Sequence, residues 1–79
     1  MLNEVIEILR EALNLGENIE VTECTSSDSL PEWDSFGQIV LFQKLEQHFD
    51  LKFSFDEMIS MESVGDICQV IENKQHQNK

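Results

Sequence analysis

The stretch Trp33-Asp34-Ser35-Phe36-Gly37 stands at the start of a predicted amphipathic helix. A polar segment containing Pro31 precedes it, and Pro31 disfavours helix before that point. Apolar residues at helical spacing follow it: Phe36, Ile39, Phe42, Leu45 and Phe49. The pattern therefore predicts a serine hydroxyl at a helix N-terminus, with an acid before it and a large apolar residue after it.

The length and composition predict one small domain. Seventy-nine residues, 41% hydrophobic and 27% charged, are typical of a globular chain rather than a disordered one. A chain of this size buries only about 60% of its unfolded surface. That leaves no room for a deep substrate cavity with its own catalytic shell, which argues against an enzyme. We expect one domain over residues 1–74 and a polar tail over residues 75–79.

The charge balance excludes two classes of partner. Sixteen acidic residues against five basic ones give a formal net charge of −11. Nucleic-acid binding depends on basic residues that neutralise phosphates, so binding to DNA or RNA is not expected. Anionic membrane surfaces would repel the chain as well. The acidic surface can simply keep the protein soluble, or it can steer partners that carry basic patches.

The cysteines and the hydropathy indicate a cytoplasmic protein. Cys24 and Cys68 are 44 positions apart and form no metal-binding or redox motif, so we expect reduced thiols with structural roles. The first residues lack a basic region followed by a continuous apolar stretch, so no signal peptide is expected. No run approaches 18 apolar residues, so no membrane span is expected either.

Apolar spacing predicts three main helices. The first covers residues 2–15, and Gly16 is placed to end it in a left-handed conformation. The second covers residues 35–49. The last begins after Ser63, a good N-cap, with Asp66 as a weak capping-box partner. Three apolar residues form its predicted inner face: Val64, Ile67 and Ile71.

The segments between these helices are predicted to be loops. Residues 17–34 are polar and rich in Ser and Thr, with three apolar anchors at Ile19, Val21 and Leu30. Residues 50–55 are interpreted as packed loop rather than strand, and residues 56–60 as a short helical turn. The expected fold is all-α: a small antiparallel bundle of three main helices plus one short helix, with a long first loop.

The sequence resembles the acyl carrier proteins over nearly its whole length. Asp34-Ser35-Phe36 stands where that family has its Asp-Ser-Leu attachment motif. Leu45–Leu51 resembles the Leu-Glu-x-x-Phe segment that closes the family's second helix, and Phe49 follows Ser35 by 14 positions, as in the family. Ser63–Ile67 resembles the stretch that opens the last helix. An Asp-Ser dipeptide alone is no signal, but the combination is strong.

A second triplet, Asp28-Ser29-Leu30, matches the family motif more literally. Pro31 directly follows it and biases Leu30 away from helical dihedral angles. No apolar helical stripe starts there, and Phe49 follows Ser29 by 20 positions rather than 14. Ser29 is therefore interpreted as a loop residue.

The resemblance implies that Ser35 accepts 4′-phosphopantetheine from coenzyme A, and that the arm carries a substrate as a thioester. The phosphate would lie at a helix N-terminus, which favours negative charge. The simpler alternative is that Ser35 only caps its helix. By the same resemblance, Asp34 would help to position the transferase and its metal-bound cofactor. Phe36 would contact partners, with core filling as its alternative role. No catalytic residue and no metal site is expected in this chain.

The predicted second helix departs from the fatty-acid type of carrier. That subclass has a helix rich in acids, whereas here Glu46 is the only acid, and Val40 stands where the subclass has a glutamate. Gly37 is typical of carriers for D-alanine and other small acids. We therefore expect a carrier closer to dedicated small-acid, aminoacyl or secondary-metabolite systems, with a docking surface formed by Phe36, Val40 and Glu46. Trp33 should pack the loop against the bundle, or contact the arm or cargo.

The resemblance implies a stand-alone, monomeric carrier with three kinds of partner. These are a phosphopantetheinyl transferase, a ligase that activates an acyl or aminoacyl group, and a downstream acyltransferase or synthase. One alternative is a non-carrier acidic helical module that docks a partner through the second helix. Another is a calcium-sensing helix pair, suggested by Asp56-Glu57, but the chain lacks the Asp-x-Asp-x-Asp-Gly loop and its closing glutamate.

Overall fold

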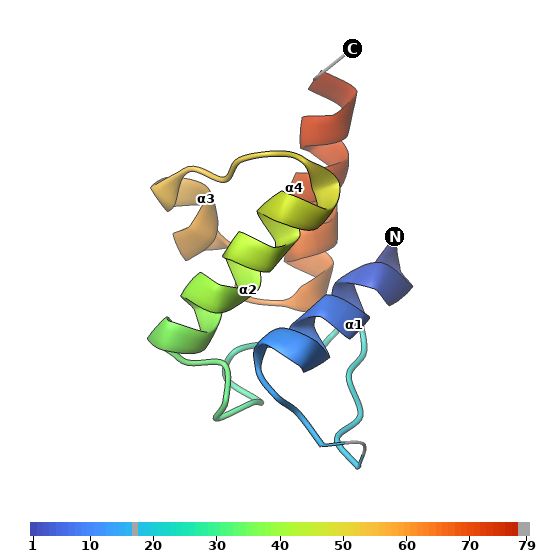
Figure 1. The fold of residues 1–79 in the computed structure, drawn as a ribbon, viewed down its shortest axis with the longest axis vertical. Coiled ribbons are helices and arrows are strands. Elements are labelled where there is room, and N and C mark those ends of the chain that lie inside the picture. Colours follow the sequence, from blue (N-terminus) through green and yellow to red (C-terminus); the bar gives the residue numbers. More distant parts are fainter. Residues whose placement is uncertain (17, 78–79) are drawn as a thin grey trace.

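A computed structural model describes residues 1–16 and 18–77, and their fold is all-α (Figure 1). Four helices follow one another along the chain: α1 (Leu2–Ala12), α2 (Ser35–Phe49), α3 (Phe55–Ser60) and α4 (Val64–Gln77). α1 contacts both α2 and α4, and it runs opposite in direction to α2. The predicted small bundle of three main helices and one short helix is confirmed. Residues 78–79 of the predicted tail lie outside the described residues.

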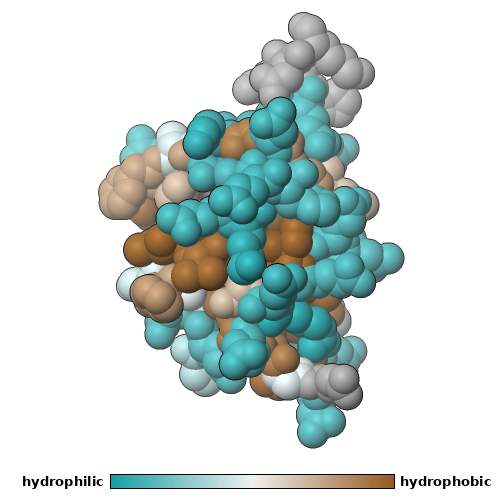
Figure 2. Space-filling model, viewed as in Figure 1, coloured by the Kyte–Doolittle hydropathy of each residue, from teal (hydrophilic) through white to brown (hydrophobic). Residues whose placement is uncertain are grey.

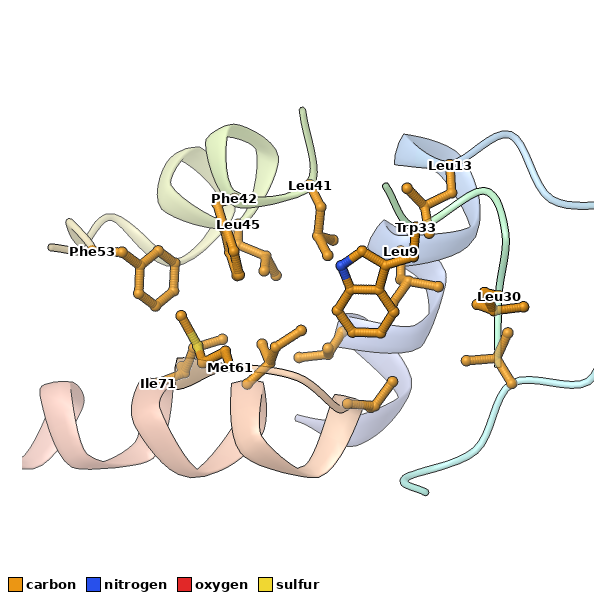
Figure 3. Close-up of a cluster of buried hydrophobic side chains, with 14 of the residues drawn as sticks. Leu9, Leu13, Leu30, Trp33, Leu41, Phe42, Leu45, Phe53, Met61 and Ile71 are labelled. Atoms are coloured by element: carbon orange, nitrogen blue, oxygen red, sulfur yellow. The ribbon is translucent and has the colours of Figure 1, made fainter. Parts of the chain in front are cut away.

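The core lies between the helices and includes side chains from the loops (Figure 3). Val64, Ile67 and Ile71 of α4 are fully buried, as predicted. α1 contributes Val5 and Leu9. The remaining buried apolar side chains come from α2 and the connecting segments: Leu13, Val21, Leu30, Trp33, Leu41, Phe42, Leu45, Leu51, Phe53 and Met61. Burial of this apolar surface is the main stabilising contribution to so small a domain.

α1 ends three residues earlier than predicted, and Gly16 is not its cap. Asn14 takes the left-handed conformation instead, with φ of 53°. Its N–H donates to the carbonyl of Glu11 at 3.3 Å, and the Leu15 N–H donates to the carbonyl of Arg10 at 3.0 Å. These two bonds form a Schellman motif. Asparagine can replace glycine there because its short polar side chain tolerates left-handed dihedral angles.

The apolar stripe of α2 is buried only in part. Phe42 and Leu45 are buried, but Phe36 and Ile39 are exposed, and Leu41 is buried in their place. The buried side of α2 begins at Gly37. Phe36 and Ile39 therefore lie on the outer side of this helix.

Gly37 allows the start of α2 to approach α1 and the preceding loop closely. A Cβ atom at this position would lie 2.6 Å from Cδ2 of Leu13 and 2.7 Å from the carbonyl oxygen of Glu32. The second of these atoms belongs to the backbone and cannot rotate away. The glycine thus has a packing role that its spacing in the sequence did not show.

Gly37→Ala is expected to destabilise the protein by about 1–3 kcal/mol, because overpacking outweighs the gain of about 1 kcal/mol in helix propensity. Urea unfolding followed by circular dichroism measures the change. Gly16→Ala is the matched control, because a Cβ atom there meets nothing within 4 Å and the residue has no positive φ. Equal stability of the two variants would contradict the packing role of Gly37.

The long first loop is fixed to the start of α4 by backbone hydrogen bonds. The N–H groups of Val64 and Gly65 donate to the carbonyls of Thr25 and Glu23, each at 2.9 Å. Ser63 also caps the helix as predicted, because its hydroxyl accepts from the Asp66 N–H at 3.2 Å. Since the loop ends at the N-terminus of α2, this attachment helps to hold the Trp33-Asp34-Ser35 segment in place.

The connection from α2 to α3 is a packed loop, as predicted. Leu51 and Phe53 are buried without forming a strand. The Ser54 side chain accepts from the Glu57 N–H at 3.1 Å, and the Glu57 carboxylate accepts from the Ser54 N–H at 2.7 Å. This capping box starts α3 one residue earlier than predicted. No residue of α3 itself is buried.

Candidate functional site

Ser35 is the first residue of α2, and its side chain is exposed. The cap of this helix is Asp34, whose Oδ1 accepts from the Gly37 N–H at 2.8 Å. The alternative role of Ser35 as the N-cap is therefore wrong. Within residues 1–16 and 18–77, the Ser35 hydroxyl makes no hydrogen bond. Asp34 thus caps the helix, and the hydroxyl of its neighbour Ser35 is left available for modification.

Four exposed large apolar side chains lie near Ser35 on α2 and α3. Phe36 is 76% exposed and Ile39 56% exposed on α2, while Phe55 is 75% and Ile59 57% exposed on α3. Figure 2 shows apolar surface over these two helices. We call these four residues the apolar patch. An exposed apolar cluster of this kind is typical of an interaction surface.

A cavity of about 520 Å³ lies between α2 and α3 and borders Ser35. Six large apolar side chains line it: Trp33, Ile39, Phe42, Phe55, Met58 and Ile59. Ser35 and Gln38 contribute polar groups to its lining, together with Ser27, Asp28 and Asp34. The site therefore combines an exposed hydroxyl, an apolar cavity and an apolar patch at one end of α2.

Polar contacts hold α3 over this cavity. The Gln38 side chain donates from Nε2 to the carbonyl of Met58 at 2.9 Å. Lys74 of α4 forms an ion pair of 2.8 Å with Glu57. This Lys74 contact, and secondly the hydrogen bond from the Ser54 backbone, hold the pKa of Glu57 below its ordinary value of 4.5.

The stabilisation from Glu57 should be lost at low pH. A carboxylate with a lowered folded-state pKa stabilises the fold above its unfolded pKa, and this contribution disappears as the pH falls through the folded pKa. We expect wild type to exceed Glu57→Gln in unfolding free energy by about 0.2–1 kcal/mol near neutrality, because the pair is partly exposed. The difference should shrink below about pH 4.5. Gln keeps the capping box, so urea unfolding at several pH values measures the charge alone. A difference independent of pH would contradict this account.

No family model matches the chain, but it is similar to a solved structure. That structure is the solution structure of a holo acyl carrier protein from Geobacter metallireducens. The two chains are 27% identical with a TM-score of 0.84, and the match covers 98% of this chain and 87% of the other. This chain has the acyl carrier protein fold. The likeness supports that family and a carrier rather than a catalytic enzyme.

On this acyl carrier protein fold, Ser29 lies in the first loop, as predicted. Its hydroxyl donates to the Ser26 carbonyl at 2.8 Å and accepts from the Ser26 N–H at 3.0 Å. Leu30, the next residue, is buried. The Asp28-Ser29-Leu30 triplet thus forms a local turn, and its serine hydroxyl is already hydrogen-bonded.

Two of the predicted docking residues lie differently from expectation. Val40 is half-buried rather than exposed. Glu46 is also half-buried, and its Oε2 accepts from the Phe53 N–H at 2.9 Å. Glu46 therefore holds the loop between α2 and α3, a task that its spacing on the helix did not reveal. Phe36 is exposed as expected, and roles of these residues in partner binding stay predictions.

The described residues contain no group of three or more His, Cys, Asp or Glu side chains placed to hold a metal. His48 lies near the far end of α2 from Ser35 and pairs with Glu4 at 2.9 Å. In the described part of the chain, no helix is long and apolar enough to cross a membrane.

Sequence reasoning missed the part of the site that α3 contributes. Phe55 and Ile59 are four positions apart and share one face of this short helix. That spacing was the available signal, but Phe55 was assigned to the packed loop. Ile39 was also missed, because it was considered only as part of the apolar stripe of α2.

Proposed function

We propose that this chain is an acyl or aminoacyl carrier whose Ser35 accepts 4′-phosphopantetheine from coenzyme A. The observation that carries the proposal is the exposed Ser35 hydroxyl at the first position of α2, with Asp34 supplying the cap. The holo acyl carrier protein with the same fold supports it. Attachment at Ser35 would leave the capping bond of α2 intact.

The residues around Ser35 fit a phosphodiester-linked arm. The N–H groups in the first turn of a helix have no acceptor within the helix. Of the first three N–H groups of α2, the Asp34 side chain accepts a hydrogen bond only from that of Gly37. The N–H groups of Ser35 and Phe36 thus remain to interact with a phosphate, which the helix dipole also favours. The bound arm would supply a thiol that holds a substrate as a thioester. The cavity beside Ser35 offers apolar side chains against which the end of the arm can pack.

The charge distribution supports a dedicated pathway rather than general fatty-acid synthesis. The only acid on α2, Glu46, is already hydrogen-bonded to Phe53. The outer side of this helix near Ser35 carries Phe36 and Ile39 instead. We infer that the activating ligase and the downstream acyltransferase or synthase bind mainly by apolar contact. If this protein accepted acyl groups from a general fatty-acid synthase as readily as that system's own carrier does, the inference would be contradicted.

The deciding experiment is intact-mass measurement after incubation with coenzyme A and a broad-specificity phosphopantetheinyl transferase. The protein should gain the mass of one arm, and fragmentation should locate it on Ser35. The apolar patch would also serve a non-carrier module that only docks a partner. Such a module would bind its partner with no gain in mass, and that result would reject the carrier proposal.

A further inference from the structure

Trp33 has a buried hydrogen-bond donor without a partner. The side chain is only 4% exposed, and its Nε1 makes no hydrogen bond with any described residue. Buried indole N–H groups usually find an acceptor, because an unsatisfied buried donor costs free energy. A phenylalanine would fill much of this space without that cost. The indole nitrogen therefore calls for an explanation beyond packing.

The position of Trp33 connects this donor to the cavity beside Ser35. Trp33 lines that cavity together with Phe42, and it precedes Ser35 by only two residues. Figure 3 shows the indole nitrogen on the edge of the ring that is turned toward Leu41 of α2. An oxygen atom reaching past the cavity toward this edge would meet an unused donor.

An ordered water is a poor partner for this nitrogen. A buried water normally makes two to four hydrogen bonds. The described core contains no buried polar or charged residue, and the labelled side chains that the nitrogen faces are hydrocarbon. The labelled side chains around the nitrogen would offer such a water no further hydrogen bond. A ligand that brings one oxygen on an otherwise apolar body suits the surroundings better.

We infer that the Trp33 indole N–H recognises an oxygen atom of the group attached at Ser35, a carbonyl or hydroxyl oxygen inserted between α2 and α3. The inference rests on the proposed carrier function. The oxygen can belong to an amide of the arm or to the acyl group that the arm carries. If the oxygen lies in the cargo beyond the thioester, Trp33 would favour oxygen-bearing cargo over a plain hydrocarbon chain.

Access to the nitrogen requires neighbouring groups to move, and α3 is the element best able to do so. None of its residues is buried. The contact from Gln38 to the Met58 carbonyl and the ion pair between Lys74 and Glu57 hold it by polar groups near the surface. Insertion of a ligand would displace α3 without opening the contacts of α1 with α2 and α4.

The single tryptophan of the chain makes the test direct. Its indole N–H gives one signal in a ¹H–¹⁵N spectrum of the labelled protein. Four samples are compared: unmodified protein, protein bearing the arm alone, and protein bearing a butyryl or a 3-hydroxybutyryl group on the arm. Each loaded sample is prepared with a phosphopantetheinyl transferase and the matching coenzyme A derivative, and its mass is checked.

A downfield shift of the indole proton with slower exchange with water is the expected result. A shift that is already present with the arm alone assigns the acceptor to the arm. A shift that is absent with the arm alone and equal with both acyl groups assigns it to the thioester carbonyl. A shift with 3-hydroxybutyryl only assigns it to the cargo. An unchanged signal in all samples of confirmed mass overturns the inference. Absence of the mass gain overturns the carrier proposal itself, so the two failures are distinguishable.

Trp33→Phe supplies a second, independent measurement. The variant keeps an aromatic ring but lacks the donor, so its melting temperature without the arm should be close to that of wild type. Loading with the group that shifts the indole signal should raise the melting temperature of wild type more than that of Trp33→Phe. Equal increases would overturn the inference. If the variant does not fold, the spectra of the wild-type protein still decide.

Discussion

Ser35→Ala is expected to abolish attachment of 4′-phosphopantetheine and therefore all loading of cargo. The hydroxyl oxygen of Ser35 is the atom that would form the phosphodiester, and alanine has no replacement for it. Folding should be preserved, because the cap of α2 is the Asp34 carboxylate. Alanine also has a higher helix propensity than serine, so we expect stability to change by no more than about 0.5 kcal/mol.

Intact mass after incubation with coenzyme A and a transferase measures the modification, and thermal melting measures the fold. Ser29→Ala is the matched control, since it removes a serine hydroxyl from the competing triplet. It should take up the arm normally, although it loses the local bonds to Ser26. Modification of Ser35→Ala together with failure of Ser29→Ala would show that Ser29 is the attachment site.

Ile39→Glu is expected to reduce loading or transfer by a dedicated partner by about 30-fold or more. A residue at the centre of an apolar interface contributes about 2 kcal/mol or more to binding, and the added carboxylate would have to be desolvated. Ile39 is exposed, so the unfolding free energy should change by no more than about 0.5 kcal/mol. Transfer rates with the purified partner and a thermal melt separate the two effects.

Gln43→Glu is the matched control for this substitution. It adds the same charge to an exposed position of α2, but Gln43 lies outside the apolar patch and the cavity. Transfer should remain close to wild type. Val40→Glu is less informative, because a charge at this half-buried position is expected to destabilise the fold. Equal losses in Ile39→Glu and Gln43→Glu would indicate recognition by overall charge, and apolar docking would be wrong.

The sequence predicted the framework because the framework depends on local signals. The apolar spacing of α4 and the Ser63 cap follow from periodicity and capping preferences. The predicted bounds of α2, Ser35 and Phe49, are also those of the structure. Pro31 and the lack of an apolar stripe around Ser29 correctly placed the competing triplet in a loop. These features require no knowledge of what lies across the core.

The parts that were missed depend on contacts between distant residues. At Gly37, the inward side of α2 lies against Leu13 and the Glu32 carbonyl, so helical spacing alone could not show that Ile39 is exposed. Glu46 has a structural contact only because Phe53 comes back to it from the following loop. In each case the decisive neighbour lies across a turn or on another element, where spacing along one helix carries no information.

The absence of buried residues in α3 has a consequence for how the domain opens. Segments held by few buried contacts exchange their backbone hydrogens through local opening, at a free energy well below that of global unfolding. α3 should therefore belong to a less protected cooperative unit than the packed segments of α1, α2 and α4. The wall of the cavity would then open many times for each complete unfolding of the chain. A group held in the cavity would then be exposed and covered repeatedly while the rest of the fold stays intact.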